Sequence, residues 1–179
     1  MRAAALRAAA AVAVLASSAC GYALVGRGVT TDPSIKRIGV PTFKDATGKP
    51  GLDQKITQKV IEELLKRGRF DVVQAATGVD ALVEGELVSY SVVPVGFSED
   101  GTGANRTQAS RYAISLTARV KYVKVGEKEP LWASDSFVFR DEYDIGADAA
   151  TFFDREDQSI DRLATSFARN LVAAMLEAF

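Results

Sequence analysis

Cysteine and histidine often carry protein chemistry, and this sequence of 179 residues has one cysteine and no histidine. Without histidine, the Ser-His-Asp and Cys-His catalytic arrangements and the usual zinc sites are excluded. The side chain most used for proton transfer near neutral pH is also missing. A carboxylate-only enzyme, such as a glycan hydrolase, would need two acids facing across a cleft, and the sequence offers no persuasive pair. The sequence therefore favours a non-catalytic protein with no metal or other cofactor.

The only cysteine, Cys20, follows a segment that is typical of export signals. Arg2 and Arg7 precede nine small or apolar residues at 8–16, and further small residues follow. This order predicts a secretory signal peptide over residues 1–19, because nine residues are too few to span a bilayer. A buried N-terminal helix is the weaker alternative, since such a helix would need polar residues on one face.

The position of Cys20 indicates lipidation. An exported chain with a single cysteine cannot form an internal disulfide, so an unpaired thiol at this point requires another role. Followed by Gly21, Cys20 resembles the cysteine of bacterial lipoprotein signals, which receives diacylglycerol and becomes the new N-terminus. The usual leucine three residues earlier is replaced by Ser17. An acyl anchor would hold the protein on a membrane without spanning it. The alternative is that Cys20 is a free thiol just after an ordinary cleavage site.

The charge of the mature chain excludes one class of partner. Without the signal peptide the chain has 20 basic and 23 acidic side chains, and no block of lysine or arginine. These features argue against a nucleic-acid binder and against a polybasic membrane binder. An anionic ligand would therefore have to be bound by a few local cations.

The first half of the mature chain has the pattern of strand, helix and strand. Residues 34–43 alternate and predict a strand, residues 44–50 have loop composition, and residues 70–74 predict another short strand. Between them lies a helix that ends at Gly68, with apolar residues four apart at Leu52, Ile56, Val60 and Leu64. This order implies a parallel crossover.

Three longer strands follow, over residues 80–97, 111–125 and 131–143. The apolar phase of the first shifts after Leu87, which predicts a bulge. The second alternates regularly, so one face should be buried and the other wet. In the third, Asp135 interrupts the predicted inward-facing residues, which indicates either a hydrogen-bonded core residue or a change of face. Its inward-facing residues are predicted to be Leu131, Ala133, Phe137 and Phe139.

A long amphipathic helix closes the chain, with its apolar face running from Ile160 to Ala178. Asp154, Glu156 and Asp157 should lie in or before its first turn, where the helix dipole favours acids, although they could also hold a cation. The sum is an α+β fold of order βαββββα. Two helices should pack on one face of a mixed, mostly antiparallel sheet of four to five strands, in a single domain over residues 34–179 after a lipid-anchored tether at 20–33.

Several short segments together resemble the LptE family, which consists of small lipoproteins that assist lipopolysaccharide assembly at the Gram-negative outer membrane. The resemblance covers nearly all of the mature chain and rests on the order and spacing of short motifs. These are Cys20-Gly21-Tyr22-Ala23-Leu24, Gly51-Leu52-Asp53, Ala81-Leu82-Val83-Glu84-Gly85, Leu131-Trp132 and the C-terminal helix from Ile160 to Met175.

The resemblance implies a binding role on the periplasmic side of the outer membrane. Family members plug the β-barrel subunit of the lipopolysaccharide translocon, help the barrel to fold, and contact lipopolysaccharide. A different envelope adaptor, such as an activator of a peptidoglycan synthase, is the alternative. About thirteen residues separate Cys20 from the first strand, or ~45 Å when fully extended, which favours work close to the membrane.

Three arginines are the candidates for contact with lipopolysaccharide, because lipid A phosphates require charge-assisted donors. Arg106 lies in the long loop at 98–110 and is the first candidate, and Arg111 and Arg155 are the second. All three could instead be solvated surface cations. Arg119 and Arg140, on the predicted wet face, could line a barrel wall or keep the sheet soluble.

Overall fold

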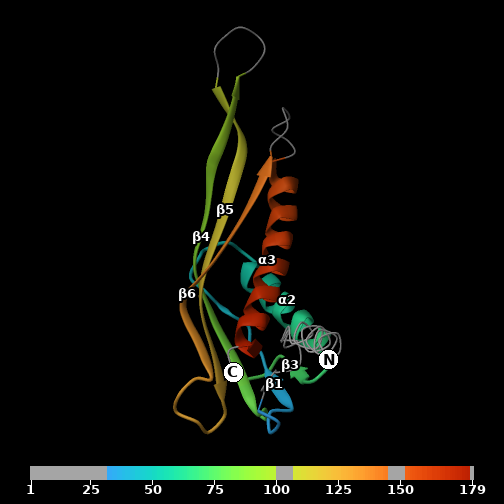
Figure 1. The fold of residues 1–179 in the computed structure, drawn as a ribbon. Helices are drawn as coiled ribbons and strands as arrows, with labels where there is room; N and C mark the ends of the chain where they lie inside the picture. Colours follow the sequence, from blue (N-terminus) through green and yellow to red (C-terminus); the bar gives the residue numbers. More distant parts are fainter. Residues whose placement is uncertain (1–31, 100–106, 145–151, 178–179) are drawn as a thin grey trace, which may run out of the picture.

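The computed structural model describes residues 32–99, 107–144 and 152–177. Cys20, the predicted signal peptide, most of the predicted tether and Arg106 lie outside the described residues. The elements along the chain are β1 (Arg37–Gly39), β2 (Lys44–Asp45), α2 (Leu52–Lys66), β3 (Asp71–Val73), β4 (Ala81–Glu99), β5 (Thr107–Lys124), β6 (Trp132–Asp144) and α3 (Phe152–Glu177) (Figure 1). Two helices and a mixed sheet confirm the predicted α+β fold.

The first half of the fold is a parallel strand–helix–strand unit. β1 pairs in parallel with β3 on one side and with β4 on the other. α2 begins after Gly51 and is followed by Gly68, and both glycines have positive φ values, of 76° and 65°, that suit helix boundaries. The side chain of Thr57 ties α2 to the segment between β1 and β2, because its hydroxyl accepts the Phe43 N–H at 3.0 Å and donates to the Asp53 carbonyl at 2.7 Å.

The predicted first strand and loop differ from the observed chain path. Only Arg37–Gly39 of the predicted strand is in β1, and the predicted loop at 44–50 begins with β2, which pairs in parallel with β4 at Glu86 and Leu87. Pro41 has no N–H to donate, so the chain leaves the ladder between the two short strands. The sheet therefore has six strands, with the order β3-β1-β4-β5-β6 and β2 also against β4.

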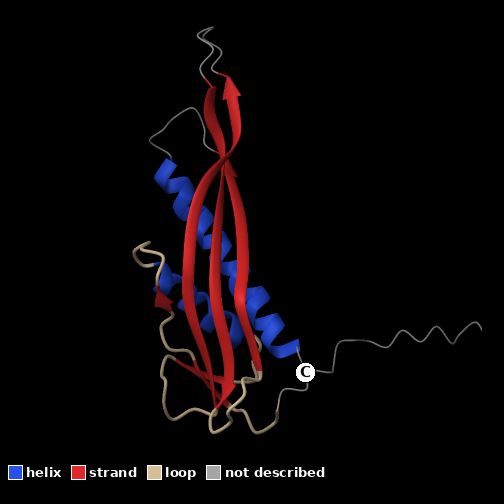
Figure 2. Ribbon diagram, turned by 90° about the vertical axis from the view of Figure 1, so that its left-hand side faces the viewer, coloured by secondary structure: helices blue, strands red, loops and turns tan. Residues whose placement is uncertain are grey.

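The second half is an antiparallel meander of three long strands. β4 pairs with β5 along its whole length, and β5 pairs with β6 from Arg111 to Tyr122. The bulge predicted after Leu87 is confirmed by a register shift between Leu87 and Ser89. Both β4 and β5 continue past the ends of the helices, so the upper ends of these two strands project from the body of the molecule (Figures 1 and 2).

A second register shift changes the face of β6. Phe137 lies opposite Ala118 and Ser134 opposite Val120, which leaves one extra residue in β6. Trp132 therefore packs against the core, and Ala133 is exposed. The prediction that Ala133 faces inward was wrong, whereas the change of face indicated by Asp135 is confirmed, since Asp135 is exposed beside the extra residue.

Both helices cover the same face of the sheet (Figure 2). The alternation of β5 is confirmed, because its side chains at even positions from Ile114 to Tyr122 are buried against the helices. α3 begins at Phe152, so Glu156 and Asp157 lie beyond its first turn, slightly deeper than predicted. The most buried large side chains of the core are Ile38, Phe43, Leu52, Ile56, Leu64, Leu87, Ile114, Leu116, Tyr122, Leu163, Phe167 and Leu171.

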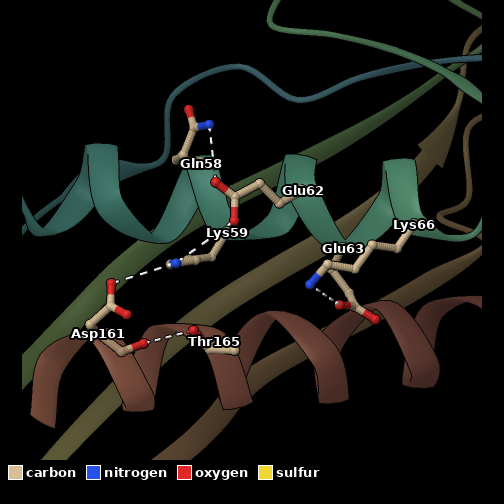
Figure 3. Close-up of polar contacts among 7 residues, drawn as sticks. All are labelled: Gln58, Lys59, Glu62, Glu63, Lys66, Asp161 and Thr165. Atoms are coloured by element: carbon tan, nitrogen blue, oxygen red, sulfur yellow. Dashed lines mark hydrogen bonds and ion pairs between the residues drawn. The ribbon is translucent and has the colours of Figure 1, made fainter. Parts of the chain in front are cut away.

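Polar contacts border the apolar seam between the helices (Figure 3). Lys59 of α2 lies 3.5 Å from the Asp161 carboxylate of α3 and 3.7 Å from that of Glu62. Within α2, Lys66 pairs with Glu63 at 3.3 Å. These partly exposed pairs each contribute little to stability, so the apolar contacts carry the packing of α2 on α3.

Candidate functional site: the open sheet face and the upper hairpin

The face of the sheet opposite the helices, here called the open face, carries the polar alternate residues of β4, β5 and β6. Its lower half is charged, with Glu84 opposite Lys121 and Glu86 opposite Arg119. In its upper half the residues of β4 and β5 are small and uncharged. There, Ser89, Ser91 and Val93 lie opposite Thr117, Ser115 and Ala113.

The lower half contains a hollow of about 450 Å³, here called the charged hollow. It lies where the chain from β1 to β2 passes beside β4. Three basic and three acidic side chains line it, so its net charge is zero. The charged hollow therefore has no excess of positive charge that would attract an anion. The residues around it are Pro41, Thr42, Lys44, Glu84, Gly85, Glu86, Arg119, Lys121 and Asp135.

Arg119 and Arg140 both lie on the strands of the open face, and both guanidinium groups are paired. Arg119 lies 3.1 Å from the Glu86 carboxylate, and Arg140 lies 3.0 Å from that of Glu142. The side chains are about half exposed, so each pair contributes little to stability. Their main effect is to give this face nearly balanced charge.

Arg111 lies at the upper end of the open face, opposite Asp144 of β6 and Gly96 of β4. Its Nε donates to the Asp144 carboxylate at 2.7 Å, and this hydrogen bond and the charge of Asp144 raise the pKa of Arg111 above its usual range. The pair is open to solvent. A Cβ on Gly96 would lie 2.9 Å from the Arg111 Cβ, so glycine leaves room for the arginine.

Two of the three candidate arginines lie among the described residues, and the structure does not bring these two together. Arg155 is exposed on α3, in the helical layer, whereas Arg111 belongs to the sheet. No contact between the two is present among the described residues, and Arg106 lies outside them. Arg111 and Arg155 are therefore separate candidates for contact with an anion.

A cluster of exposed apolar side chains lies next to Arg111 on β4, here called the apolar edge. It consists of Val93, Val95 and Phe97, which are 45%, 39% and 61% exposed. Large side chains of this type are usually covered, and grouped exposure often marks an interaction site. Sequence reasoning placed these residues on a strand but did not identify them as a site. The sequence feature that could have identified them is the segment 87–98, which contains no charged residue.

Glu156 anchors the start of α3 to β4 just below the apolar edge. Its carboxylate is 8% exposed, and it accepts hydrogen bonds from Lys49 at 2.8 Å and from the Tyr90 hydroxyl at 2.7 Å. Burial alone would raise the pKa of Glu156, but the two hydrogen bonds and the charge of Lys49 outweigh it and lower the pKa. Burial and the bond to Glu156 raise the pKa of Tyr90. The predicted helix-start acid is thus a structural contact.

Comparison with protein families shows to which family this chain is related. The sequence model of LptE, described as lipopolysaccharide-assembly, matches residues 35–175. The chain belongs to the LptE family. The match spans every element from β1 through most of α3, so the family resemblance of the short motifs is confirmed. The LptE family is thus established for the same region that builds the open face and the hairpin.

Two solved structures are similar to this chain at low sequence identity. A Xanthomonas campestris protein of the DUF330 family has a TM-score of 0.50 and 13% identity, over 79% of this chain and 84% of that one. The rare lipoprotein B of Shewanella oneidensis has a TM-score of 0.39 and 12% identity, over 78% of this chain and 92% of that one. No curated protein matches the sequence. The Xanthomonas likeness supports the fold alone.

Within 32–99, 107–144 and 152–177, no helix is both long and apolar enough to cross a membrane. The same part of the chain has no group of three or more cysteine, aspartate or glutamate residues placed to hold a metal ion.

Proposed function

We propose that this chain is the lipoprotein subunit of the lipopolysaccharide translocon, on the periplasmic side of the outer membrane. In this role it plugs the barrel subunit, assists its folding, and contacts lipopolysaccharide. The observation that carries the proposal is the LptE match over residues 35–175. The role is one of binding, not catalysis, and the absence of histidine from the sequence supports this.

The distribution of side chains supports an interaction along the sheet. α2 and α3 bury one face, and the open face has balanced charge below, small uncharged residues along the middle of β4 and β5, and paired charges on β6 above. A plug needs a face that tolerates contact with both protein and water. A charge-balanced surface satisfies that need without repelling a barrel wall of either sign.

A lipid anchor on Cys20 is the second part of the proposal. The export signal at 1–19 and the single cysteine support it. Cys20→Ala should move the protein from the membrane fraction to the soluble periplasmic fraction, because two or three acyl chains hold a mature lipoprotein. Mass spectrometry of the wild-type N-terminus should find acylated Cys20, and an unmodified N-terminus elsewhere would contradict the anchor.

Contact with lipopolysaccharide is the third part, with Arg106, Arg111 and Arg155 as the proposed donors. Arg111 has the best support, because it combines a guanidinium with the neighbouring apolar edge, as an amphiphile with phosphates and acyl chains would require. Arg111→Ala should weaken binding of purified lipopolysaccharide about tenfold, as expected for one charge-assisted hydrogen bond.

Arg140→Ala is the matched control for this measurement. The side chains of Arg111 and Arg140 are both 53% exposed, and each is paired with a carboxylate of β6. Arg140 lies lower on the open face, away from the apolar edge. Equal losses in the two variants would show that any surface arginine suffices and would remove Arg111 as a specific donor.

The barrel partnership is tested by recovering the tagged, full-length protein from detergent-solubilised outer membrane and identifying its partners by mass spectrometry. Near-equal recovery of one large barrel protein would support the translocon role. Recovery of a peptidoglycan synthase without a barrel would favour the alternative adaptor role and overturn the proposal.

A further inference from the structure

The upper part of β4 has one edge that no described strand covers. On one side, β5 pairs with β4 over its whole length. On the other side, β1 pairs only at Ala81 and Leu82, and β2 only at Glu86 and Leu87. Among the described residues, no strand pairs with residues 88–99 on that side. At about 3.3 Å per residue, this free edge is roughly 40 Å long.

Pro94 shows which backbone groups point outward along the free edge. Pro94 lies opposite Tyr112 and has no N–H, so this pair cannot be one that exchanges hydrogen bonds with β5. The register is regular from Ser89 to Pro94, so Val92 and Tyr90 have the same orientation as Pro94. The backbone N–H and C=O groups of Tyr90 and Val92 therefore point toward the free edge, together with the Pro94 carbonyl.

The side chains of this edge lack charged protection against strand pairing, although the edge contains Pro94 and has register shifts between Leu87 and Ser89 and between Pro94 and Phe97. Exposed edge strands are commonly protected by charged residues, bulges or proline. Residues 87–98 contain no charge, and Pro94 is the only proline among them. The other long edge of the sheet is different, because β6 carries charges at Asp135, Arg140, Asp141, Glu142 and Asp144. The contrast separates a charged edge from an uncharged one, and the stretch of β4 with regular register, Ser89 to Pro94, is the part suited to a partner strand.

We propose that the free edge of β4 binds an extended, uncharged segment of the barrel subunit by strand addition, centred on Tyr90 and Val92. This inference rests on the proposed function and adds its mode of binding. The outward amides supply main-chain hydrogen bonds, and the exposed Val93, Val95 and Phe97 supply apolar contacts. The uncharged edge fits an uncharged extended segment outside the barrel wall, because the strands of a closed barrel already pair on both sides.

Val92→Pro tests the backbone contact. It removes one outward amide in the way that Pro94 already does, and it leaves the hydrogen bonds to β5 in place. Val92→Ala is the matched control, because it shortens the same side chain and keeps the amide. In the membrane pull-down, Val92→Pro should recover about threefold to tenfold less barrel than Val92→Ala, the range of a net backbone hydrogen bond. Circular dichroism melting of both variants checks that each is folded.

Hydrogen exchange supplies a readout that does not depend on a variant. The Tyr90 and Val92 amides should exchange quickly in the free full-length protein and slowly in the purified complex with the barrel. Slow exchange in the free protein at low concentration would show that the chain covers its own edge and would overturn the inference.

The remaining outcomes separate the inference from the proposed function. If the wild-type protein recovers no barrel, the proposed function fails. A second outcome is that the wild-type protein recovers the barrel, Val92→Pro recovers an equal amount, and the Tyr90 and Val92 amides are not protected in the complex. That outcome overturns strand addition and leaves the proposed function intact. A wild-type dimer in solution that Val92→Pro dissociates would assign the edge to a second copy and overturn the barrel partner.

Discussion

The carboxylate of Glu156 shows how one side chain positions the proposed site. It joins the loop before α2, the start of α3 and strand β4 through Lys49 and Tyr90. Tyr90 is also one of the residues whose backbone faces the free edge. A single buried carboxylate thus supports the part of β4 that we assign to a partner.

Glu156→Gln should lower the free energy of unfolding by about 1–3 kcal/mol, because it weakens two hydrogen bonds and leaves the Lys49 ammonium without a charged partner. Urea unfolding at neutral pH measures the change. Glu62→Gln, on the exposed side of α2, is the control and should change stability by less than about 0.5 kcal/mol. Equal effects of the two changes would mean that Glu156 is no anchor.

The pH dependence of the same variant has a fixed sign. The folded-state pKa of Glu156 lies below its ordinary value of 4.5, so its contribution is fully present above that pH. It is lost as the pH falls through the folded-state pKa. Unfolding measured from pH 7 to pH 3 should therefore show the wild-type and Glu156→Gln proteins converging in stability only at the acid end. A constant difference over that range would contradict the charged contact.

Gly85 gives a packing prediction in the lower part of the sheet. A Cβ at Gly85 would clash with the ring of Phe43, which is buried at 2% exposure. Gly85→Ala should therefore cost about 1–3 kcal/mol in unfolding free energy. Adding Phe43→Leu should recover part of this loss, since the smaller side chain vacates the position. A double variant less stable than the sum of both single changes would reject the proposed clash.

At the scale of elements, aromatic packing holds α3 against β6. The Phe167 ring lies 5.3 Å from the Phe137 ring and 5.9 Å from the Phe139 ring, both in edge-to-face geometry. Phe167 is fully buried. The extra residue in β6 sets the register that brings Phe137 and Phe139 to this face.

Phe167→Ala should lower the free energy of unfolding by about 3–5 kcal/mol, the usual cost of a large cavity in a core. Leu65→Ala, at a position 52% exposed, is a control that should change it by less than about 1 kcal/mol. Chemical denaturation followed by circular dichroism measures both. A small loss for Phe167→Ala would show that α3 does not depend on this cluster.

The sequence predicted the elements with strong local periodicity and missed those set by distant contacts. The four-residue spacing of α2, the alternation of β5 and the phase shift after Leu87 are local signals, and all three predictions are confirmed. β2 has two residues and exists only because β4 pairs with it. The face of Ala133 depends on the extra residue in β6, which a period of two cannot reveal.

The same distinction applies to the candidate site. Arginines can be found in a sequence by type, but the pairing of Arg111 with Asp144 requires the register of β5 and β6. The free edge of β4 follows from which strands end early, and this is a property of the whole sheet. The uncharged segment 87–98 can be read from the sequence, but the strand pairing is needed to show that it lies at a free edge of the sheet.

At the scale of the whole molecule, the fold separates its tasks in space. The helices and one sheet face form the core, the opposite face offers the charged hollow, and the β4–β5 hairpin projects beyond both helices (Figures 1 and 2). Such a shape suits a plug that extends into a larger partner. This arrangement and the LptE match together support the proposed translocon role.

The most direct test of that role is depletion of the protein in its own bacterium, followed by measurement of lipopolysaccharide in the outer leaflet and of folded barrel subunit. We predict that both fall as the protein is lost, and that re-expression of the wild-type chain restores them. Unchanged surface lipopolysaccharide and unchanged folded barrel after complete depletion would contradict the account.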